Sequence, residues 1–353
     1  MQKIASKVTR RSLLAGMAGV LAAPTVMGPS RAAAKSESLT LISYGGSYQD
    51  ILVKYALTPF TEETGIQVNV VPAPDLAKIK AQLLMGNVEW DIYDTTDSQA
   101  AFGSKQGFWE KLDPSMFDVG DMVVPPQSDF VSWSVVAIGI GWDPKRYGPG
   151  KHPANFADFF DLKNFQGRRA LRAYAEGNLE AALLADGVSP KDMYPLDVER
   201  ALNVLDHIKP SVAAWSAAPQ QPITLLQTGE VDFSFTTVNR VKATTEPGGG
   251  VPLAFSFEQN VFYTDSLAVL KGAPNKENAM KLVAYLLRPE VQARVTEPFG
   301  FIPVSKNAKS MFSDESSKWL PDLNNPKSLF TSNIYWADNF ESVSRRFKEW
   351  IVR

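Results

Sequence analysis

Cysteine is absent from this chain of 353 residues, and histidine is nearly so, because His152 and His207 are the only two. The lack of cysteine excludes disulfides, cysteine-bound zinc, iron–sulfur ligation, a cysteine nucleophile and a lipid-modified N-terminal cysteine. A multi-histidine metal site is excluded too, and a Ser-His-Asp triad would have to use one of the two histidines. Long hydrophobic runs are also missing: the run Leu13 to Met27 has 15 residues, fewer than the ~18 of a membrane span.

Neither sign of charge dominates the whole chain, whose formal net charge is −2. Nucleic-acid binding needs a basic surface, so this balance disfavours a nucleic-acid partner. The hydrophobic fraction of 44% and the charged fraction of 21% are ordinary for a globular protein and argue against a disordered chain. The length exceeds what one compact core usually holds, so two lobes or domains are expected.

The first 34 residues have the composition of an export signal peptide. A basic start is followed by the apolar run and by Ala32–Ala34, the small residues that a signal peptidase requires. The segment around Arg10 and Arg11 resembles a twin-arginine export signal, with an ordinary secretory signal as the alternative. Residues 1–34 hold five basic residues and no acidic one, which leaves 31 basic and 38 acidic residues and a net charge of −7. We therefore expect an acidic protein that diffuses freely in the periplasm without a membrane anchor.

Hydrophobic patterning predicts an α/β fold for the rest of the chain. Over residues 39–94 three predicted strands alternate with two predicted helices, which indicates a mostly parallel α/β sheet. Asp75 is expected to cap the helix that follows it, and Gly86 to end that helix. The predicted strands are 39–43, 66–71, 91–94, 135–140, one from 168, 229–235, 253–257 and 266–270, and the predicted helices are 47–65, 76–85, 178–186, 197–208, 223–227, 275–287, one from 288, and 334–353.

The pattern of the first region resumes after residue 265, which predicts that the chain leaves one lobe, builds a second and returns. The expected boundaries are 35–142 and 264–309 for lobe one, 143–263 for lobe two, and 310–353 for a C-terminal segment packing on lobe two and the hinge. Two crossings make a hinge, and a hinge between two α/β lobes makes a cleft.

The stretch Val261 to Asn307 resembles the polyamine-type (spermidine/putrescine) periplasmic substrate-binding proteins of ABC importers. Shorter segments agree with that family in order along the chain, namely 43–48, 59–65, 90–91, 133 with 137–141, 167–171, 183–189, 225–231 and 336–339. The resemblance implies a type II fold, with a hinged cleft between two mixed-sheet α/β lobes. It also implies no catalysis, no cofactor, and a monomeric carrier that delivers its cargo to an inner-membrane ABC permease.

Members of this family hold a primary amine with a carboxylate and enclose the alkyl chain with aromatic rings. A charged hydrogen bond to an ammonium is worth roughly 1.5–3 kcal/mol, and an aromatic face adds roughly 0.5–2 kcal/mol. Asp265 matches the amine-binding carboxylate and Tyr263 an aromatic position beside it. Tyr44 and Tyr48 follow the first strand at its C-terminal end, where open α/β sheets bind ligands. Trp133 is a candidate for the cleft wall. Core packing is the alternative for Tyr44, Tyr48 and Trp133, and a strand cap or a structural pairing is the alternative for Asp265.

Three further candidates carry weaker signals. Phe301 matches a family aromatic, with core packing as its alternative. Asp97 is a candidate second anion, although the N-cap of the following helix is the favoured interpretation. Tyr174 and Gly177 stand where polyamine binders place acidic residues, and Glu176, the acidic residue of that stretch, is out of register.

Departures from the family pattern change the expected cargo. Thr237 replaces another aromatic position, and Arg240 follows shortly after it. An arginine at the cleft would repel a dication but would bind a carboxylate through two parallel hydrogen bonds, a role that Arg172 could also fill. Relatives with the same Asn-then-Arg region take zwitterions such as 4-aminobutyrate. The expected cargo is therefore a small amine, either a polyamine such as putrescine or a zwitterion such as 4-aminobutyrate. A solvated surface charge is the alternative role for both arginines.

An exported hydrolase or lyase is the alternative of a different class. It would use Asp97, Glu176 or Asp265 as acid and base, and it would need two titrating groups poised across one pocket. The chain contains no phosphate loop and no credible nucleophile elbow. A carrier is therefore the favoured interpretation.

Overall fold

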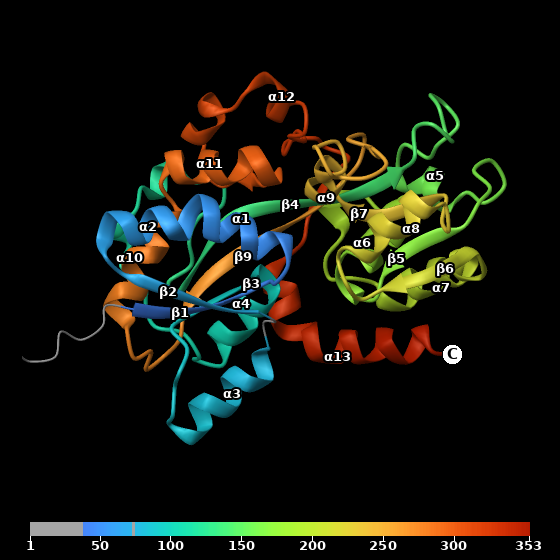
Figure 1. Cartoon of the computed structure of the whole chain (residues 1–353). Helices are drawn as coiled ribbons and strands as arrows, with labels where there is room; N and C mark the ends of the chain where they lie inside the picture. Colours follow the sequence, from blue (N-terminus) through green and yellow to red (C-terminus); the bar gives the residue numbers. More distant parts are fainter. Residues whose placement is uncertain (1–37, 73–74) are drawn as a thin grey trace, which may run out of the picture. The chain divides into compact units, whose positions relative to one another are not determined.

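The computed structural model describes residues 38–72 and 75–353, and the predicted export signal lies outside these residues. One sheet of mixed direction runs in the strand order β2-β1-β3-β9-β4-β7-β5-β6, with helices around it (Figure 1). Its strands are β1 (Ser38–Ser43), β2 (Gln67–Pro72), β3 (Ile92–Thr96), β4 (Phe130–Trp142), β5 (Arg169–Arg172), β6 (Val212–Ser216), β7 (Phe233–Thr237) and β9 (Val261–Val269). Three short strands lie off this path, namely β8 (Ala254–Phe255), β10 (Ile302–Pro303) and β11 (Leu329–Phe330).

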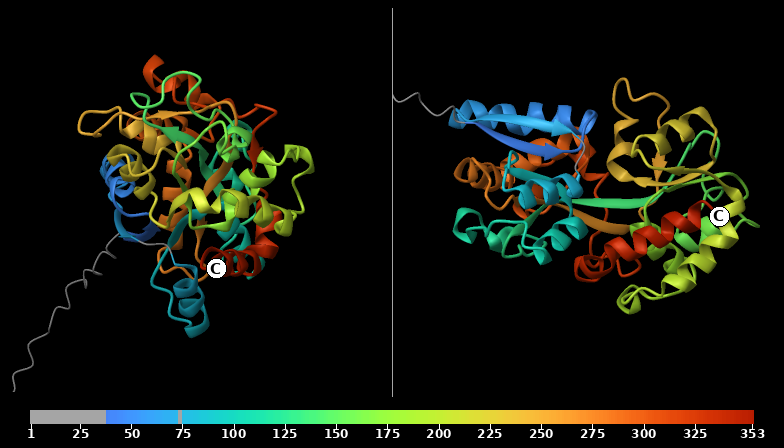
Figure 2. Two further views of the ribbon diagram at one scale, coloured as in Figure 1. Left: turned by 90° about the vertical axis from the view of Figure 1, so that its right-hand side faces the viewer. Right: turned by 90° about the horizontal axis from the view of Figure 1, so that it is seen from below.

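The helices connect and cover these strands (Figures 1 and 2). They are α1 (Ser47–Leu52), α2 (Thr58–Thr64), α3 (Leu76–Met85), α4 (Asp97–Lys105), α5 (Phe156–Phe160), α6 (Ala175–Ala185), α7 (Val198–Ile208), α8 (Gln221–Thr228), α9 (Val238–Ala243), α10 (Lys276–Leu286), α11 (Pro289–Phe299), α12 (Asp314–Ser317) and α13 (Asn333–Ile351). Helix α13 contacts α4, α6 and α7, so it joins early and late parts of the sheet. Within the described residues, no helix is long and apolar enough to cross a bilayer.

Strand direction changes in the middle of the sheet. β1 is parallel to β2 and β3, and β5 is parallel to β6 and β7. The central strands β4 and β9 are antiparallel to each other, β9 is antiparallel to β3, and β4 is antiparallel to β7. The parallel strands predicted for residues 39–94 are confirmed, and the antiparallel centre makes the sheet mixed, as the predicted fold requires. One long strand carries the chain out of the first part and the other carries it back, so the two must run in opposite directions.

β4 is buried along all 13 of its residues, which explains its nearly continuous run of β-branched and aromatic side chains. Close packing leaves no room for a side chain at Gly139. A Cβ there would lie 2.4 Å from the side-chain nitrogen Nδ2 of Asn260 and 2.7 Å from the Phe255 ring. The central strand is thereby fixed against β8 and β9.

Local signals located most element ends correctly. Asp75 caps α3 by accepting from the amides of Ala77 (2.9 Å) and Lys78 (3.2 Å), and Gly86 ends that helix with a φ of 67°, as predicted. The strand predicted from residue 229 begins only at Phe233, because Gly229 still forms the left-handed end of α8.

Candidate ligand-binding site

Two buried carboxylates lie on the neighbouring strands β3 and β9. Asp94 belongs to β3 and is fully buried, and Asp265 of β9 is 4% exposed. The antiparallel register pairs Asp94 with Leu267 and Thr96 with Asp265, which places the two acids diagonally across the strand pair on the same face of the sheet. Among the described residues, neither carboxylate forms an ion pair. Within the described chain, neither acid is therefore neutralised by a direct ion pair.

Asp94 is held by three side-chain donors. The hydroxyls of Ser43 and Tyr48 donate to its Oδ2 at 2.7 Å each, and the indole nitrogen of Trp133 donates to its Oδ1 at 3.1 Å. Burial raises the pKa of Asp94 to about 6, although the three donors act in the opposite direction. Sequence reasoning missed Asp94, which lies inside β3, whereas Tyr44 follows the end of β1.

Asp265 accepts a hydrogen bond from the Tyr44 hydroxyl at 3.3 Å. Burial raises its pKa well above the usual range, and the negative charge of Asp94 raises it further, while Tyr44 and the Arg172 cation lower it. An ionised carboxylate at such a site is costly unless it meets a cation. The structure therefore brings the predicted residues Asp265 and Tyr44 together in an arrangement suited to an ammonium group.

Four of the predicted aromatic residues form one cluster beside these acids. The ring of Tyr48 lies 5.1 Å from that of Tyr44 and 5.2 Å from that of Phe301, and the ring of Trp133 lies 5.5 Å from that of Phe301. Tyr48, Trp133 and Phe301 are at most 4% exposed, whereas Tyr44 is half-buried. A hollow of about 10 Å³ beside Trp133 and Phe301 is barely large enough for one water molecule. The three buried rings thus back the site, and Tyr44 is the ring that reaches its surface.

Two guanidinium groups lie near Tyr263 and supply positive charge to this part of the molecule. The Arg172 guanidinium lies 5.5 Å from the ring of Tyr263 and 5.4 Å from the ring of Tyr174. Nη1 of Arg240 donates to Oε1 of Gln220 at 3.0 Å. Burial lowers the pKa of Arg240, Tyr263 raises it, and the neighbouring Arg172 cation lowers it. Within the described part of the chain, neither arginine is paired with a carboxylate.

Tyr174 lies apart from the buried rings. It is 45% exposed, and its hydroxyl donates to the carbonyl oxygen of Ala217 at 2.6 Å. Its ring faces Arg172, so the structure connects it with the arginine and not with Asp265.

The carboxylates of Asp97 and Glu176 each accept hydrogen bonds from serine hydroxyls of other elements. Asp97 is the first residue of α4, whose N-cap is Thr96, so the capping interpretation of Asp97 is wrong. Its Oδ1 accepts from Ser266 at 2.9 Å and from Ser132 at 3.5 Å. Burial raises the pKa of Asp97, and the hydrogen bond from Ser266 is the largest effect that lowers it.

The Glu176 carboxylate accepts from the Ser98 hydroxyl of α4 at 2.7 Å. It stands in a non-helical turn next to Gly177, whose φ of 88° is one that glycine adopts readily. Burial raises the pKa of Glu176 to about 7, with a further contribution from Glu180. This hydrogen bond connects α4, in the β3 part of the molecule, with the start of α6 in the β5 part.

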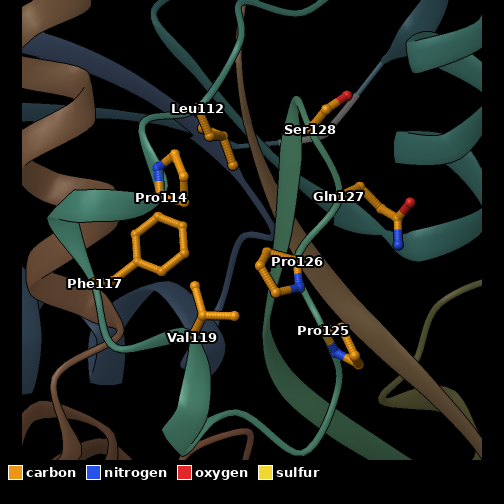
Figure 3. A pocket seen from close by; sticks show the side chains of 8 residues that line it. All are labelled: Leu112, Pro114, Phe117, Val119, Pro125, Pro126, Gln127 and Ser128. Atoms are coloured by element: carbon orange, nitrogen blue, oxygen red, sulfur yellow. The ribbon is translucent and has the colours of Figure 1, made fainter.

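A pocket of about 310 Å³ lies at another place on the molecule (Figure 3). The lining residues are Leu112, Pro114, Phe117, Val119, Pro125, Pro126, Gln127 and Ser128. Figure 3 shows the Phe117 ring between Pro114 and Val119. None of the predicted site residues lines this pocket and none of its lining residues is charged, so it is unsuited to holding an ammonium or a carboxylate.

Known proteins share this architecture and much of this sequence. A family model for bacterial extracellular solute-binding proteins matches residues 56–322. A γ-aminobutyric acid-binding protein of Pseudomonas aeruginosa is 32% identical over 338 residues, which cover 91% of this chain and 93% of that protein. A spermidine/putrescine-binding periplasmic protein of Escherichia coli is 26% identical, over 83% of this chain and 86% of that protein. The solved structure of the GABA receptor Atu4243 superposes with a TM-score of 0.82 and 31% identity, covering 89% of this chain and 97% of that chain.

Proposed function

Because the chain belongs to the bacterial extracellular solute-binding proteins, we propose that it captures a small zwitterionic amine, with 4-aminobutyrate as the reference ligand, for delivery to an ABC permease. The chain is a substrate-binding component of an ABC transporter and not an enzyme, as the sequence predicted. Its fold is the predicted two-lobed type II fold of periplasmic binding proteins.

The observation that carries this proposal is the separation of charge at the site. Asp265, with Asp94 behind it, offers negative charge at one end. Arg172 and Arg240 offer two cations without a carboxylate partner at the other, close to Tyr263. An ammonium pairs with the first end, and a carboxylate pairs with a guanidinium through two parallel hydrogen bonds. The second ammonium of a diamine would instead meet two cations, so a zwitterion fits better than putrescine.

Location and assembly follow as further parts of the proposal. We infer that the protein works outside the cytoplasmic membrane as a free monomer in the periplasm, after residues 1–34 have directed its export. The lobes are assigned as 35–142 with 264–309 and as 143–263, with 310–353 as the C-terminal segment. The crossings of β4 and β9 support this division. The solute would bind where the strands leave one lobe for the other.

Calorimetric titration and thermal unfolding with 4-aminobutyrate and putrescine test the function. At 100 times its Kd, a ligand adds about 2.7 kcal/mol to the free energy of unfolding, so a clear rise in melting temperature is expected with 4-aminobutyrate. If neither compound nor any amino acid or betaine in a broad panel raises it, the amine proposal fails. Small molecules released from the denatured purified protein would identify the natural cargo directly.

Arginine variants distinguish a zwitterion from a polyamine. Arg172→Ala and Arg240→Ala should each weaken 4-aminobutyrate binding by about 10- to 100-fold, the loss of one charged hydrogen-bonded pair, without weakening putrescine binding. Arg288→Ala is the matched control, because Arg288 forms an exposed ion pair with Glu63 at 2.9 Å. Unchanged 4-aminobutyrate affinity in both site variants would contradict the zwitterion and favour a polyamine.

A further inference from the structure

We propose that Asp94 is a second carboxylate of the amine subsite. It is a positioning residue that orients Tyr48 and Trp133, and its negative charge strengthens the binding of an ammonium group at Asp265. This inference rests on the proposed function, since it names a residue that sets affinity and specificity at the same site.

The hydrogen bonds of Asp94 show that it acts from behind the site. Ser43 of β1, Tyr48 of α1 and Trp133 of β4 donate to it from three separate elements. Both of its oxygens are occupied and the residue is fully buried. It therefore has no access to a ligand, but it fixes two of the rings that back Tyr44.

One pair of tyrosines links the two carboxylates. The rings of Tyr44 and Tyr48 lie 5.1 Å apart, edge to face. The Tyr48 hydroxyl donates to Asp94 and the Tyr44 hydroxyl donates to Asp265. A change of charge or position at Asp94 is thus transmitted to the group that faces the ligand.

The charges around the pair leave Asp94 as the main anion that Asp265 experiences. The titratable groups that influence the two acids from the packed elements are Tyr44, Tyr48, Tyr93, Tyr263 and Arg172. All four tyrosines have raised pKa values, chiefly through burial, so they are neutral near pH 7. The same Coulombic field that disfavours ionisation of Asp265 favours a cation beside it.

Asp94→Asn keeps the size of the side chain and an oxygen acceptor while removing the charge. Without that charge, the pKa of Asp265 falls, because its second largest cause of elevation is gone. Ammonium binding requires ionised Asp265, so the pH at which affinity is lost moves to a lower value. The affinity at pH 8 also falls, since one attracting anion is missing. A purely structural role would weaken binding at every pH and leave that midpoint in place.

The experiment is calorimetric titration of the full chain with 4-aminobutyrate and with putrescine between pH 5 and 8. For Asp94→Asn we expect about tenfold weaker binding at pH 8. We also expect the pH midpoint of binding to fall by about one unit, because one pKa unit corresponds to about a tenfold change in an equilibrium constant. Asp91→Asn is the matched control: Asp91 is also fully buried and accepts from the amides of Thr40 and Asn275. This control should leave the midpoint unchanged.

Ser43→Ala keeps the test decisive if Asp94→Asn does not fold. Loss of the Ser43 donor raises the pKa of Asp94 above its value of about 6, so Asp94 loses its charge at a higher pH than in the unsubstituted protein. Binding should match the unsubstituted protein at pH 8 and be several-fold weaker at pH 6.5. An unshifted midpoint in Asp94→Asn, or a loss independent of pH in Ser43→Ala, would overturn the role of Asp94 alone. Failure of the unsubstituted protein to bind either compound would overturn the proposed function and this inference with it.

Discussion

Asp265, the proposed ligand-binding carboxylate, is expected to reduce the stability of the ligand-free protein. Its pKa is raised in the folded protein, first by burial and then by Asp94, whereas an unfolded aspartate titrates near 3.9. The folded state therefore holds a proton that the unfolded state releases as pH increases. The stability linked to this proton is present below the unfolded pKa and is lost as pH rises through the folded pKa. The ligand-free protein should consequently lose this contribution as pH rises from the unfolded pKa of about 3.9 through the folded pKa of Asp265.

Asp265→Asn should abolish binding of 4-aminobutyrate and raise the stability of the ligand-free protein at pH 8 by about 1 kcal/mol, within the range typical of relieved functional strain. The gain should shrink at pH 5, because the raised pKa leaves more of the native carboxyl protonated there than at pH 8. Urea unfolding at both pH values measures it.

Asp232→Asn is the control of opposite sign. Although burial acts against it, the pKa of Asp232 is lowered by the amide of Arg168, by Tyr147 and by Arg146. Removing this carboxylate breaks an ion pair of 2.6 Å with Arg146, so it should destabilise the protein at pH 8 and leave ligand affinity intact.

Retained binding in Asp265→Asn would contradict the assignment of Asp265.

Single residues differed in how far the sequence could predict them. Asp265 and Tyr44 carry signals in their own segments, and the structure joins them by a hydrogen bond. Asp94 depends on donors from β1, α1 and β4, and no local pattern shows that these donors converge. Arg172 and Arg240 could be proposed from their chemistry. The sequence did not show that both lie near Tyr263, because that proximity arises from the tertiary fold.

At the scale of elements, β4 is the strand on which both parts of the sheet depend. It pairs with β9 on one side and with β7 on the other, and it carries Trp133 into the aromatic cluster. Gly139 permits this by allowing Asn260 and Phe255 to approach its backbone.

Gly139→Ala should destabilise the protein by about 1–3 kcal/mol, the usual cost of overpacking a core, because the new Cβ would overlap the Asn260 side chain at 2.4 Å. Gly148→Ala is the control, since a Cβ there meets nothing within 4 Å and Gly148 has no positive φ. Chemical denaturation of the two variants measures the difference. Equal midpoints would show that β4 tolerates the extra methyl group.

Element boundaries followed from local chemistry, whereas the order of the strands did not. Asp75 and Gly86 bound α3 as predicted, because capping involves residues close in sequence. β9 was expected as a strand only from residue 266, but it runs from Val261 to Val269, since pairing with β4 and β11 extends it. Such pairing joins segments far apart in the sequence and leaves no periodic signal in either.

At the scale of the whole molecule, contacts between distant segments support a carrier that closes on its ligand. Ser98 of α4 donates to Glu176 at the start of α6, and α13 contacts α4 as well as α6 and α7. The hydrogen bond lies in a polar region that includes Arg172, one of the groups that influence the pKa of Glu176. Binding a zwitterion between Asp265 and the arginines would favour the arrangement in which these contacts are made.

The route of export is the last property that belongs to the whole chain. A protein without cysteine needs no oxidative step after it crosses the membrane, so it can be folded before export. The twin-arginine route reads its signal through a receptor, and lysine keeps the charge but lacks the planar fork of arginine. Arg10→Lys with Arg11→Lys should therefore leave the precursor in the cytoplasm, as measured by cell fractionation. Lys3→Gln with Lys7→Gln is the control. It removes two positive charges but keeps both arginines, so it should still permit export. Equal export of both variants would indicate the general secretory route, which reads the apolar run and a basic start and does not distinguish arginine from lysine.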